Sequence, residues 1–232
     1  MRVLDVGCGA GDVSIVAADM VGETGFVVGL DQASVAVKTA TARTKELGIS
    51  NIEFICASLD ALEAHQPFDA AVGRNLLIHQ NDPTALLRQV VKLVRDGGLI
   101  VFQEHDFTLR VESAWPPVPL LETCFRWITE AHDRSGLQVD LGKKLHQVFR
   151  AAGLPGPEMR LERLIGSKYT ESYAWFCAAM VRTLLPKLET FGIASREEIK
   201  IDTLGQRIER ELLGKDAVII GAPMIAAWSH KS

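Results

Sequence analysis

The chain has 232 residues, of which 47% are hydrophobic and 23% are charged, and its formal net charge is −4 at pH 7. This hydrophobic share is that of a folded globular protein and excludes wholesale disorder. The negative charge and the absence of a long Lys/Arg block argue against nucleic acid as a partner, which leaves a small molecule as the expected ligand.

Short strands alternate with helices over the first half of the chain. The spacing of apolar residues predicts strands at 3–7, 22–31 (after a turn), 52–57, 68–73 and 99–106, and helices at 12–20, 33–49 and 82–95. We expect Asp82 and Pro83 to begin the third helix and residues 96–98 to end it. Such alternation implies a parallel sheet, which binds ligands at the carboxyl ends of its strands where the strand order switches.

The pattern changes after residue 107. Segments 111–152 and 169–214 are largely helical, 158–166 predicts one strand, and 216–231 predicts a final hairpin-forming strand. We expect one domain over residues 1–232, with its core at about 1–110, 156–166 and 215–232 and a helical lid at about 111–152 and 169–214. The predicted fold class is α/β: a doubly wound, Rossmann-like, mostly parallel sheet with helical lid insertions.

The placement of the cysteines and the hydropathy of the chain indicate the cellular compartment in which we expect the protein. The four cysteines lie far apart, at Cys8, Cys56, Cys124 and Cys177. They form no C-x-x-C pair, which is typical of reduced thiols rather than of a disulfide framework or a zinc site. The apolar run at 217–228 is too short to span a bilayer, and Asp5 interrupts any signal-like run at the N-terminus. We therefore expect a cytoplasmic protein with no membrane partner.

The stretch "VLDVGCGAGD", residues 3–12, places glycines at positions 7, 9 and 11 directly after a predicted strand. A dinucleotide-binding loop has the wider spacing G-x-G-x-x-G. The stretch resembles the first motif of the class I S-adenosylmethionine-dependent methyltransferases, in the small-molecule group similar to the quinone-biosynthesis C-methyltransferases. The resemblance continues through "FDAAVGRNLLIH" and the Gly-Gly turn to residue 106, with a weaker match at "PMIAAWSHK" near the C-terminus.

The resemblance implies S-adenosyl-L-methionine as the cofactor and methyl transfer to a small organic acceptor as the activity. It assigns ten residues to the cofactor: Asp5, Gly7, Gly9, Gly11, Asp31, Gln32, Ser58, Leu59, Arg74 and Asn75. Asp31 stands where the family accepts both ribose hydroxyls, and Gln32 would border the adenine. Glycines let the backbone approach the methionine part without Cβ clashes. A buried Asp5 needs a partner, because an unpaired buried carboxylate is costly.

The third strand departs from the family pattern. Ala57 and Ser58 stand where the family often has a Gly-Asp pair, and Ser58 binds less strongly than a carboxylate does. Asp60 is either a substitute for that acid or a surface acid of a turn. Within the glycine loop, Cys8 is read as a small residue rather than as a functional thiol.

Catalysis of methyl transfer depends chiefly on alignment of the reacting atoms, and a base is needed only where the acceptor must lose a proton. His79 and His105 follow the fourth and fifth strands and are the candidates for that base, with packing or site lining as the alternative for each. Neighbouring strand residues point to opposite faces, so no metal is expected at 104–106. Glu104 and Asp106 either bind a cationic acceptor or, as the favoured reading, solvate the end of the strand.

Two other functions stay open: an NAD(P)-dependent oxidoreductase and a non-catalytic S-adenosylmethionine-binding paralogue. The glycine spacing argues against the oxidoreductase. Ser58, in place of the family's acid, and the start of the chain are compatible with the non-catalytic paralogue. We expect a monomer or homodimer whose partner is a small-molecule methyl acceptor. Because Met1 stands so close to the first strand, we expect a form that lacks the family's usual N-terminal helical segment and has a more open site.

Overall fold

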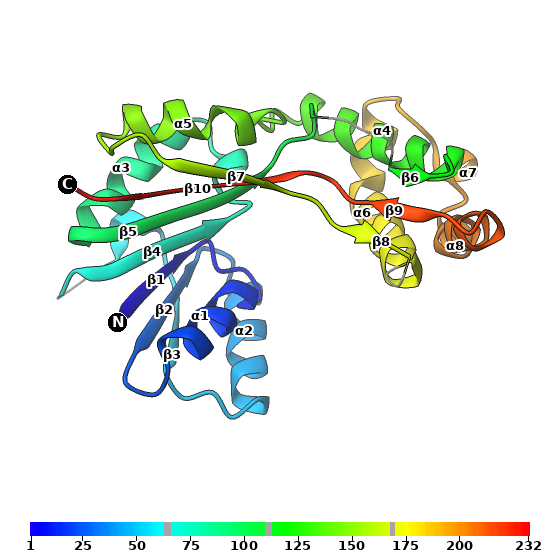
Figure 1. Ribbon diagram of the computed structural model, residues 1–232. Helices are drawn as coiled ribbons and strands as arrows, with labels where there is room; N and C mark the ends of the chain where they lie inside the picture. Colours follow the sequence, from blue (N-terminus) through cyan, green and yellow to red (C-terminus); the bar gives the residue numbers. More distant parts are fainter. Residues whose placement is uncertain (63–65, 110–112, 168–169) are drawn as a thin grey trace. The chain divides into compact units, whose positions relative to one another are not determined.

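The computed structural model describes residues 1–62, 66–109, 113–167 and 170–232. Its chain divides into two compact units (Figure 1). The first, here called the sheet unit, comprises Met1–Glu104, Leu141–Arg160 and Ile225–Ser232. The second unit comprises His105–Asp140 and Leu161–Met224.

A seven-stranded sheet forms the centre of the sheet unit. In spatial order its strands are β3 (Ile52–Cys56), β2 (Phe26–Asp31), β1 (Arg2–Val6), β4 (Phe68–Arg74), β5 (Val94–His105), β10 (Met224–His230) and β7 (Glu158–Glu162). The pairs β1/β2, β2/β3, β1/β4 and β4/β5 are parallel. The strand order reverses at β1, between β2 and β4, and open α/β sheets bind ligands at such a switch point.

Helices flank this sheet (Figure 1). They are α1 (Asp12–Val21), α2 (Ser34–Glu46), α3 (Pro83–Leu93) and α5 (Leu141–Ala151), with short 3-10 turns at η1 (Leu59–Ala61) and η2 (Leu77–His79). Helix α3 begins as predicted, because the Asp82 side chain accepts the backbone N–H of Ala85 at 2.9 Å and Pro83 is the first helical residue. The predicted α/β, Rossmann-like, mostly parallel sheet is confirmed.

The predicted boundary between the third helix and the fifth strand is wrong. Residues 96–98 were expected to end the helix, but α3 ends at Leu93 and β5 begins at Val94. The N–H of Gly97 donates to the carbonyl of Lys231, and the N–H of Lys231 donates to the carbonyl of Gly98, each at 2.9 Å. A partner from the other end of the chain therefore holds this stretch in β5, with Gly97 at a φ of 72°, and no local sequence signal reports such a partner.

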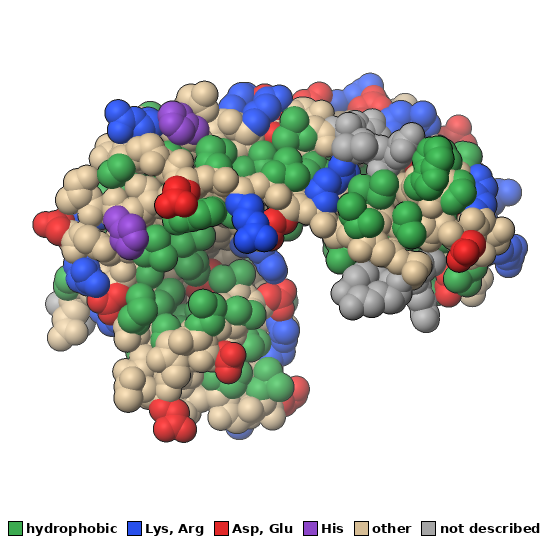
Figure 2. Space-filling model, viewed as in Figure 1, with side chains coloured by type: hydrophobic (Ala, Val, Ile, Leu, Met, Phe, Trp, Pro, Cys, Tyr) green, Lys and Arg blue, Asp and Glu red, His purple; other side chains and the backbone are tan. Residues whose placement is uncertain are grey.

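The second unit combines a small antiparallel sheet with helices. Its strands, in order, are β6 (Ala114–Trp115), β9 (Val218–Ile220) and β8 (Ile165–Gly166). Its helical segments are α4 (Pro119–Arg134), α6 (Thr170–Thr190), α7 (Arg196–Ile199), η3 (Ile201–Thr203) and α8 (Leu204–Gly214). Helix α6 packs against α4 and α8. On the face of this unit that Figure 2 shows, separate hydrophobic side chains lie among polar and charged ones.

Two C-terminal predictions are wrong in the same way. The single strand predicted at 158–166 is two strands, β7 and β8, and the strand predicted at 216–231 is β9 and β10. In each case one strand joins each sheet. Pro223, which has no N–H, lies between β9 and β10, and the N–H of Gly221 donates to Leu164 at 2.8 Å instead of continuing a hairpin.

The segment expected as the first half of the lid divides between the two units. Its last part forms α5, which belongs to the sheet unit. There Arg88 of α3 donates to the carbonyl of Ala151 at 2.7 Å, and the ring of Phe149 meets that of Phe102 edge-on at 6.4 Å between centroids. The lid role of the other helices stays a prediction, and the expected segment ends at 110, 111 and 169 lie outside the described residues.

Across the ranges described here, no helix has both the length and the apolar character needed to cross a bilayer.

Close packing of β4 against β5 gives a first test. A Cβ added at Gly73 would stand 2.4 Å from Cε1 of Phe102, a fully buried ring. We expect Gly73→Ala to lower the free energy of unfolding by about 1–3 kcal/mol, because the ring has no room to move. Urea unfolding followed by circular dichroism measures the change. As a control, Gly156→Ala meets nothing closer than Nε2 of His146 at 3.5 Å and is expected to stay within about 0.5 kcal/mol. Equal losses in both variants would contradict this account.

Candidate functional site

The glycine loop joins β1 to α1 at the switch point of the sheet. Gly7, Gly9 and Gly11 have φ angles of 68°, 54° and 84°, which disfavour residues with a Cβ. A Cβ at Gly7 would lie 2.8 Å from Leu76, and one at Gly11 would lie 3.0 Å from the ring of Phe54. The loop therefore needs glycine both for its backbone conformation and for its close neighbours.

Asp31, the last residue of β2, fixes this loop from the side. One of its carboxylate oxygens accepts the N–H of Gly9 at 2.9 Å, and the other accepts the N–H of Ala33 at 2.8 Å. Each oxygen keeps a further lone pair for another donor. The half-buried carboxylate is thus held in one orientation with acceptor capacity left over.

Asp5 lies beneath the loop and is buried, with 1% of its surface exposed. The hydroxyl of Ser14 in α1 donates to Oδ2 of Asp5 at 2.5 Å. Ser14 is therefore the hydrogen-bond partner that we expected for a buried carboxylate at this position. Burial raises the pKa of Asp5 to about 6, although the Ser14 bond opposes the shift. Asp5 therefore ties α1 to β1 below the loop.

A cavity of about 220 Å³ lies at the carboxyl ends of β1 and β2. It is lined by Val6, Gly7, Leu30, Asp31, Gln32, Ala57, Leu59, Leu76, Gln80 and Leu86. The structure thus brings together Gly7, Asp31, Gln32 and Leu59 from the residues that the sequence singled out. Ser58 instead precedes the η1 turn and is not among the lining residues.

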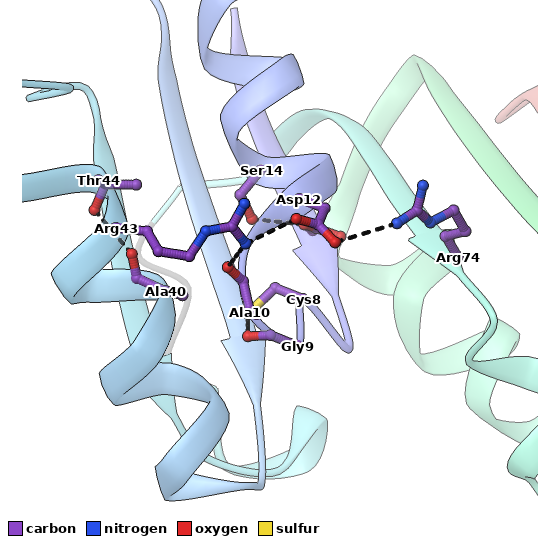
Figure 3. Close-up of polar contacts among 10 residues, drawn as sticks. Cys8, Gly9, Ala10, Asp12, Ser14, Ala40, Arg43, Thr44 and Arg74 are labelled. Carbon is purple, nitrogen blue, oxygen red and sulfur yellow. Dashed lines mark hydrogen bonds and ion pairs between the residues drawn. The ribbon is translucent and has the colours of Figure 1, made fainter. Parts of the chain in front are cut away.

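Two arginines brace the glycine loop from its outer side (Figure 3). Nη1 of Arg43, in α2, donates to the carbonyl of Ala10 at 2.6 Å and to Oδ1 of Asp12 at 2.7 Å. Arg74, at the end of β4, lies 3.6 Å from Oδ2 of the same aspartate. Asp12 therefore joins the start of α1 to both neighbouring elements. Because these side chains are partly exposed, we count the pairs as positioning contacts rather than as a large source of stability.

Glu104 of β5 organises the loop that follows β4. Its side chain is fully buried and accepts the backbone N–H groups of Leu76, Leu77 and Ile78 at 3.0, 2.9 and 3.3 Å. Burial outweighs these bonds and raises the pKa of Glu104 to about 7. The carboxylate thereby holds Leu76 against Gly7 in the wall of the cavity.

The reading of Glu104 and Asp106 as groups that solvate the end of the strand is wrong. Both side chains are fully buried. Asp106 accepts from the hydroxyl of Thr108 at 2.6 Å and from the N–H groups of Thr108 and Leu109 at 3.0 and 3.2 Å. Buried carboxylates satisfied by backbone donors are structural supports, so neither side chain is available to solvent.

Asn75 lies between Arg74 and this supported loop in a left-handed conformation, with φ of 53°. Its N–H donates to the carbonyl of Gln103 at 2.9 Å. Oδ1 of its side chain is buried and finds no hydrogen-bond partner among the residues that the structure describes. A buried acceptor without a donor is costly, and a ligand that carries a donor would satisfy it.

The candidate bases lie in different surroundings. His79 ends the η2 turn and is exposed, and it is not one of the residues that line the cavity. His105 is half-buried, with Nδ1 at 3.3 Å from the carbonyl of Pro223 and its ring 5.4 Å from that of Phe107. A catalytic role for either histidine stays a prediction.

Cys8 lies in the glycine loop, and its side chain is buried. Burial, helped by the carboxylates of Asp5 and Asp31, raises the pKa of the Cys8 thiol to about 12. The thiol therefore stays protonated at neutral pH, which agrees with its reading as a small residue. Within the described part of the chain, no group of three or more His, Cys, Asp or Glu residues is placed to hold a metal ion.

Several residues of the site were missed by the sequence analysis. Leu76 and Gln80 belong to the loop after β4, whose backbone was expected near the ligand. Because they follow Arg74 and Asn75 closely in the sequence, they could have been assigned to the site on that ground. Leu86 lines the cavity from α3, and Arg43 braces the loop from α2. No local pattern marks these two, because their positions follow from how the helices pack.

Comparisons with known proteins agree with this geometry. The family described as "Methyltransferase domain" matches residues 1–153. The ubiquinone biosynthesis O-methyltransferase of Neisseria meningitidis serogroup A is 33% identical over 105 residues, covering 44% of this chain and 42% of that protein. The protein of the same name from Idiomarina loihiensis is 34% identical over 138 residues, covering 57% and 54%.

A solved structure shares the fold. The YcgJ protein from Bacillus subtilis superposes with a TM-score of 0.60 at 17% identity, covering 100% of this chain and 92% of that one. The chain spans about half the length of the curated relatives it matches, at 42% and 54% of the two named above.

The buried carboxyl of Glu104 makes stability depend on pH. Its pKa is raised from 4.5 to about 7, so the folded state binds the proton more tightly than the unfolded state does. The stabilisation is complete below about pH 4.5 and is lost as the pH rises through 7. Between pH 5 and pH 8 we expect the free energy of unfolding to fall further in the wild type than in Glu104→Gln, by on the order of 2–3 kcal/mol.

Urea unfolding at the two pH values measures this difference. Glu53→Gln, on an exposed position of β3, removes a carboxylate without touching the loop and should keep the wild-type dependence. A Glu104→Gln protein with an unchanged pH dependence would show that the carboxyl does not titrate in this range.

Proposed function

The chain belongs to the methyltransferase domain family, and from that premise we propose that it transfers a methyl group from S-adenosyl-L-methionine to a small organic acceptor. The match over residues 1–153 confirms the resemblance found in the sequence. The observation that carries the proposal is Asp31, held by two backbone N–H groups at the edge of the cavity beside the glycine loop.

The residues present fit this cofactor. The remaining lone pairs of Asp31 would accept hydrogen bonds from the two ribose hydroxyls, and Gln32 and Leu59, which line the same cavity, would border the adenine. The glycine loop admits the methionine part close to the backbone. Oδ1 of Asn75 is a buried acceptor without a partner among the described residues, but Asn75 does not line the cavity, so no contact with the cofactor is assigned to it.

When bound, the cofactor supplies a methyl group already activated by a positive sulfur. The chain's own task is to align the acceptor with that group and to exclude water, because proximity and orientation make the largest contribution. Leu30, Leu76 and Leu86 give the cavity its apolar lining. For a hydroxyl acceptor a base would have to take the proton, and His79 and His105 stay the candidates that the sequence offers for that role.

The names of the two curated relatives support the class of acceptor. Both are ubiquinone biosynthesis O-methyltransferases. By analogy we assign this chain a hydroxyl-bearing aromatic acceptor of small size. The four cysteines are free, which supports work in the reducing cytoplasm. The expectation of a monomer or a homodimer stays a prediction.

The oxidoreductase alternative is not favoured by the comparisons. Asp31 would serve the ribose of a dinucleotide equally well, so that residue alone does not separate the two functions. The family match separates them, because it covers the glycine loop, the cavity and α3. A non-catalytic cofactor-binding protein would share the family and is distinguished by assay.

Transfer of a labelled methyl group tests the proposal directly. Protein is incubated with S-adenosylmethionine that carries tritium on the methyl group and with a panel of catechols, hydroquinones and amines. We expect label in a hydroxyl-bearing acceptor. Asp31→Asn should raise the KM for the cofactor by about 10- to 100-fold, because charged hydrogen bonds to the ribose are lost.

Asp19→Asn is the matched control, since Asp19 lies on α1 outside the cavity and should leave the KM unchanged. Calorimetry with S-adenosylhomocysteine and with NAD accompanies the assay. Cofactor binding without transfer to any acceptor would identify the non-catalytic alternative, and tight NAD binding in its place would overturn the proposal.

A further inference from the structure

The second unit contains a small hollow of its own, with a volume of about 30 Å³. Its lining includes Phe107, Phe125, Thr129, Arg163 and Pro223. This volume is more than the roughly 10–15 Å³ that a single water molecule needs, so the hollow accepts a small polar head group.

Arg163 gives the hollow its charge. Its Nε donates to the carbonyl of Gly221 at 2.8 Å, which orients the guanidinium. Burial lowers the pKa of Arg163, although a guanidinium keeps its charge at neutral pH. Among the residues that the structure describes, no carboxylate forms an ion pair with Arg163. A half-buried cation without a counter-charge favours an anion.

Aromatic rings continue from the hollow towards solvent. The ring centroids of Phe125 and Tyr173 lie 6.1 Å apart, as do those of Tyr173 and Phe176, and Phe176 is 54% exposed. Burial raises the pKa of Tyr173 to about 12, and its side chain bonds to the backbone of Ala222, so the phenol stays neutral. These rings form an uncharged, apolar path between the guanidinium and the surface of α6.

We propose that this hollow binds the carboxylate of a small acid whose aromatic or short apolar body lies against Phe125 and Tyr173. A carboxylate pairs with a guanidinium through parallel N–H bonds, and the hollow has room for a polar group of that size. Flat rings offer the body of the ligand a large apolar contact. The inference goes beyond the proposed methyl transfer and does not depend on it.

The competing explanation is that Arg163 only secures the backbone at Gly221. A purely structural arginine would be indifferent to the charge of an added ligand, whereas a carboxylate site distinguishes an acid from its amide. This difference can be measured on the unmodified protein.

Calorimetric titration with 3-phenylpropionate and with its uncharged amide tests the proposal. We expect the wild type to bind the acid at least about tenfold more tightly than the amide. Arg163→Gln should abolish this preference, and Arg163→Lys should retain part of it because the charge stays while the fork geometry is lost. Thermal unfolding reports whether each variant is folded.

Arg126→Gln is the matched control. Arg126 is exposed on α4 in the same unit, and its replacement by Gln removes one positive charge outside the hollow. It should bind the acid as the wild type does. Equal affinity of the wild type for acid and amide, no detectable binding of the acid, or an equal loss in Arg126→Gln would each overturn the proposal. If Arg163→Gln fails to fold, the acid–amide comparison on the wild type and on Arg163→Lys decides the matter.

Discussion

The site depends on the two hydrogen bonds that Asp31 accepts from the backbone. They tie the end of β2 to the glycine loop at Gly9 and to the start of α2 at Ala33. Since both oxygens are engaged, the carboxylate has one orientation, and a ligand that donated to its remaining lone pairs would bind without reorganisation of this side chain. Arg43 of α2 braces the same loop through Ala10, so β2 and α2 together hold one short stretch of backbone.

A second constraint acts on the opposite wall of the cavity. Glu104 is buried beneath the loop after β4 and accepts three of its N–H groups. Burial of this carboxyl costs free energy, which the hydrogen bonds offset only in part, and the pKa of about 7 is the result. Leu76, which lies against Gly7, thus belongs to a loop held by the Glu104 carboxyl. Because the pKa of this carboxyl is about 7, the hydrogen bonds that hold the loop depend on whether Glu104 is protonated.

The sequence was informative wherever a feature is local. The glycine loop, Asp31 at the end of its strand and the Asp82 cap each have a signature within a few residues, and the structure bears out all three positions. Glu104 was misread because its burial depends on a loop from another strand. Arg43 was missed for the same kind of reason, since its reach to Ala10 follows from the packing of α2 and not from a motif.

The central claim is that the cavity beside the glycine loop takes S-adenosylmethionine. Backbone amide NMR spectra recorded during titration with S-adenosylhomocysteine test it most directly, because each residue reports its own environment. The account predicts that the largest shifts fall on Gly7, Gly9, Asp31, Gln32 and Leu59, with saturation at one equivalent. Binding that leaves these amides unchanged, or shifts confined to the second unit, would contradict it.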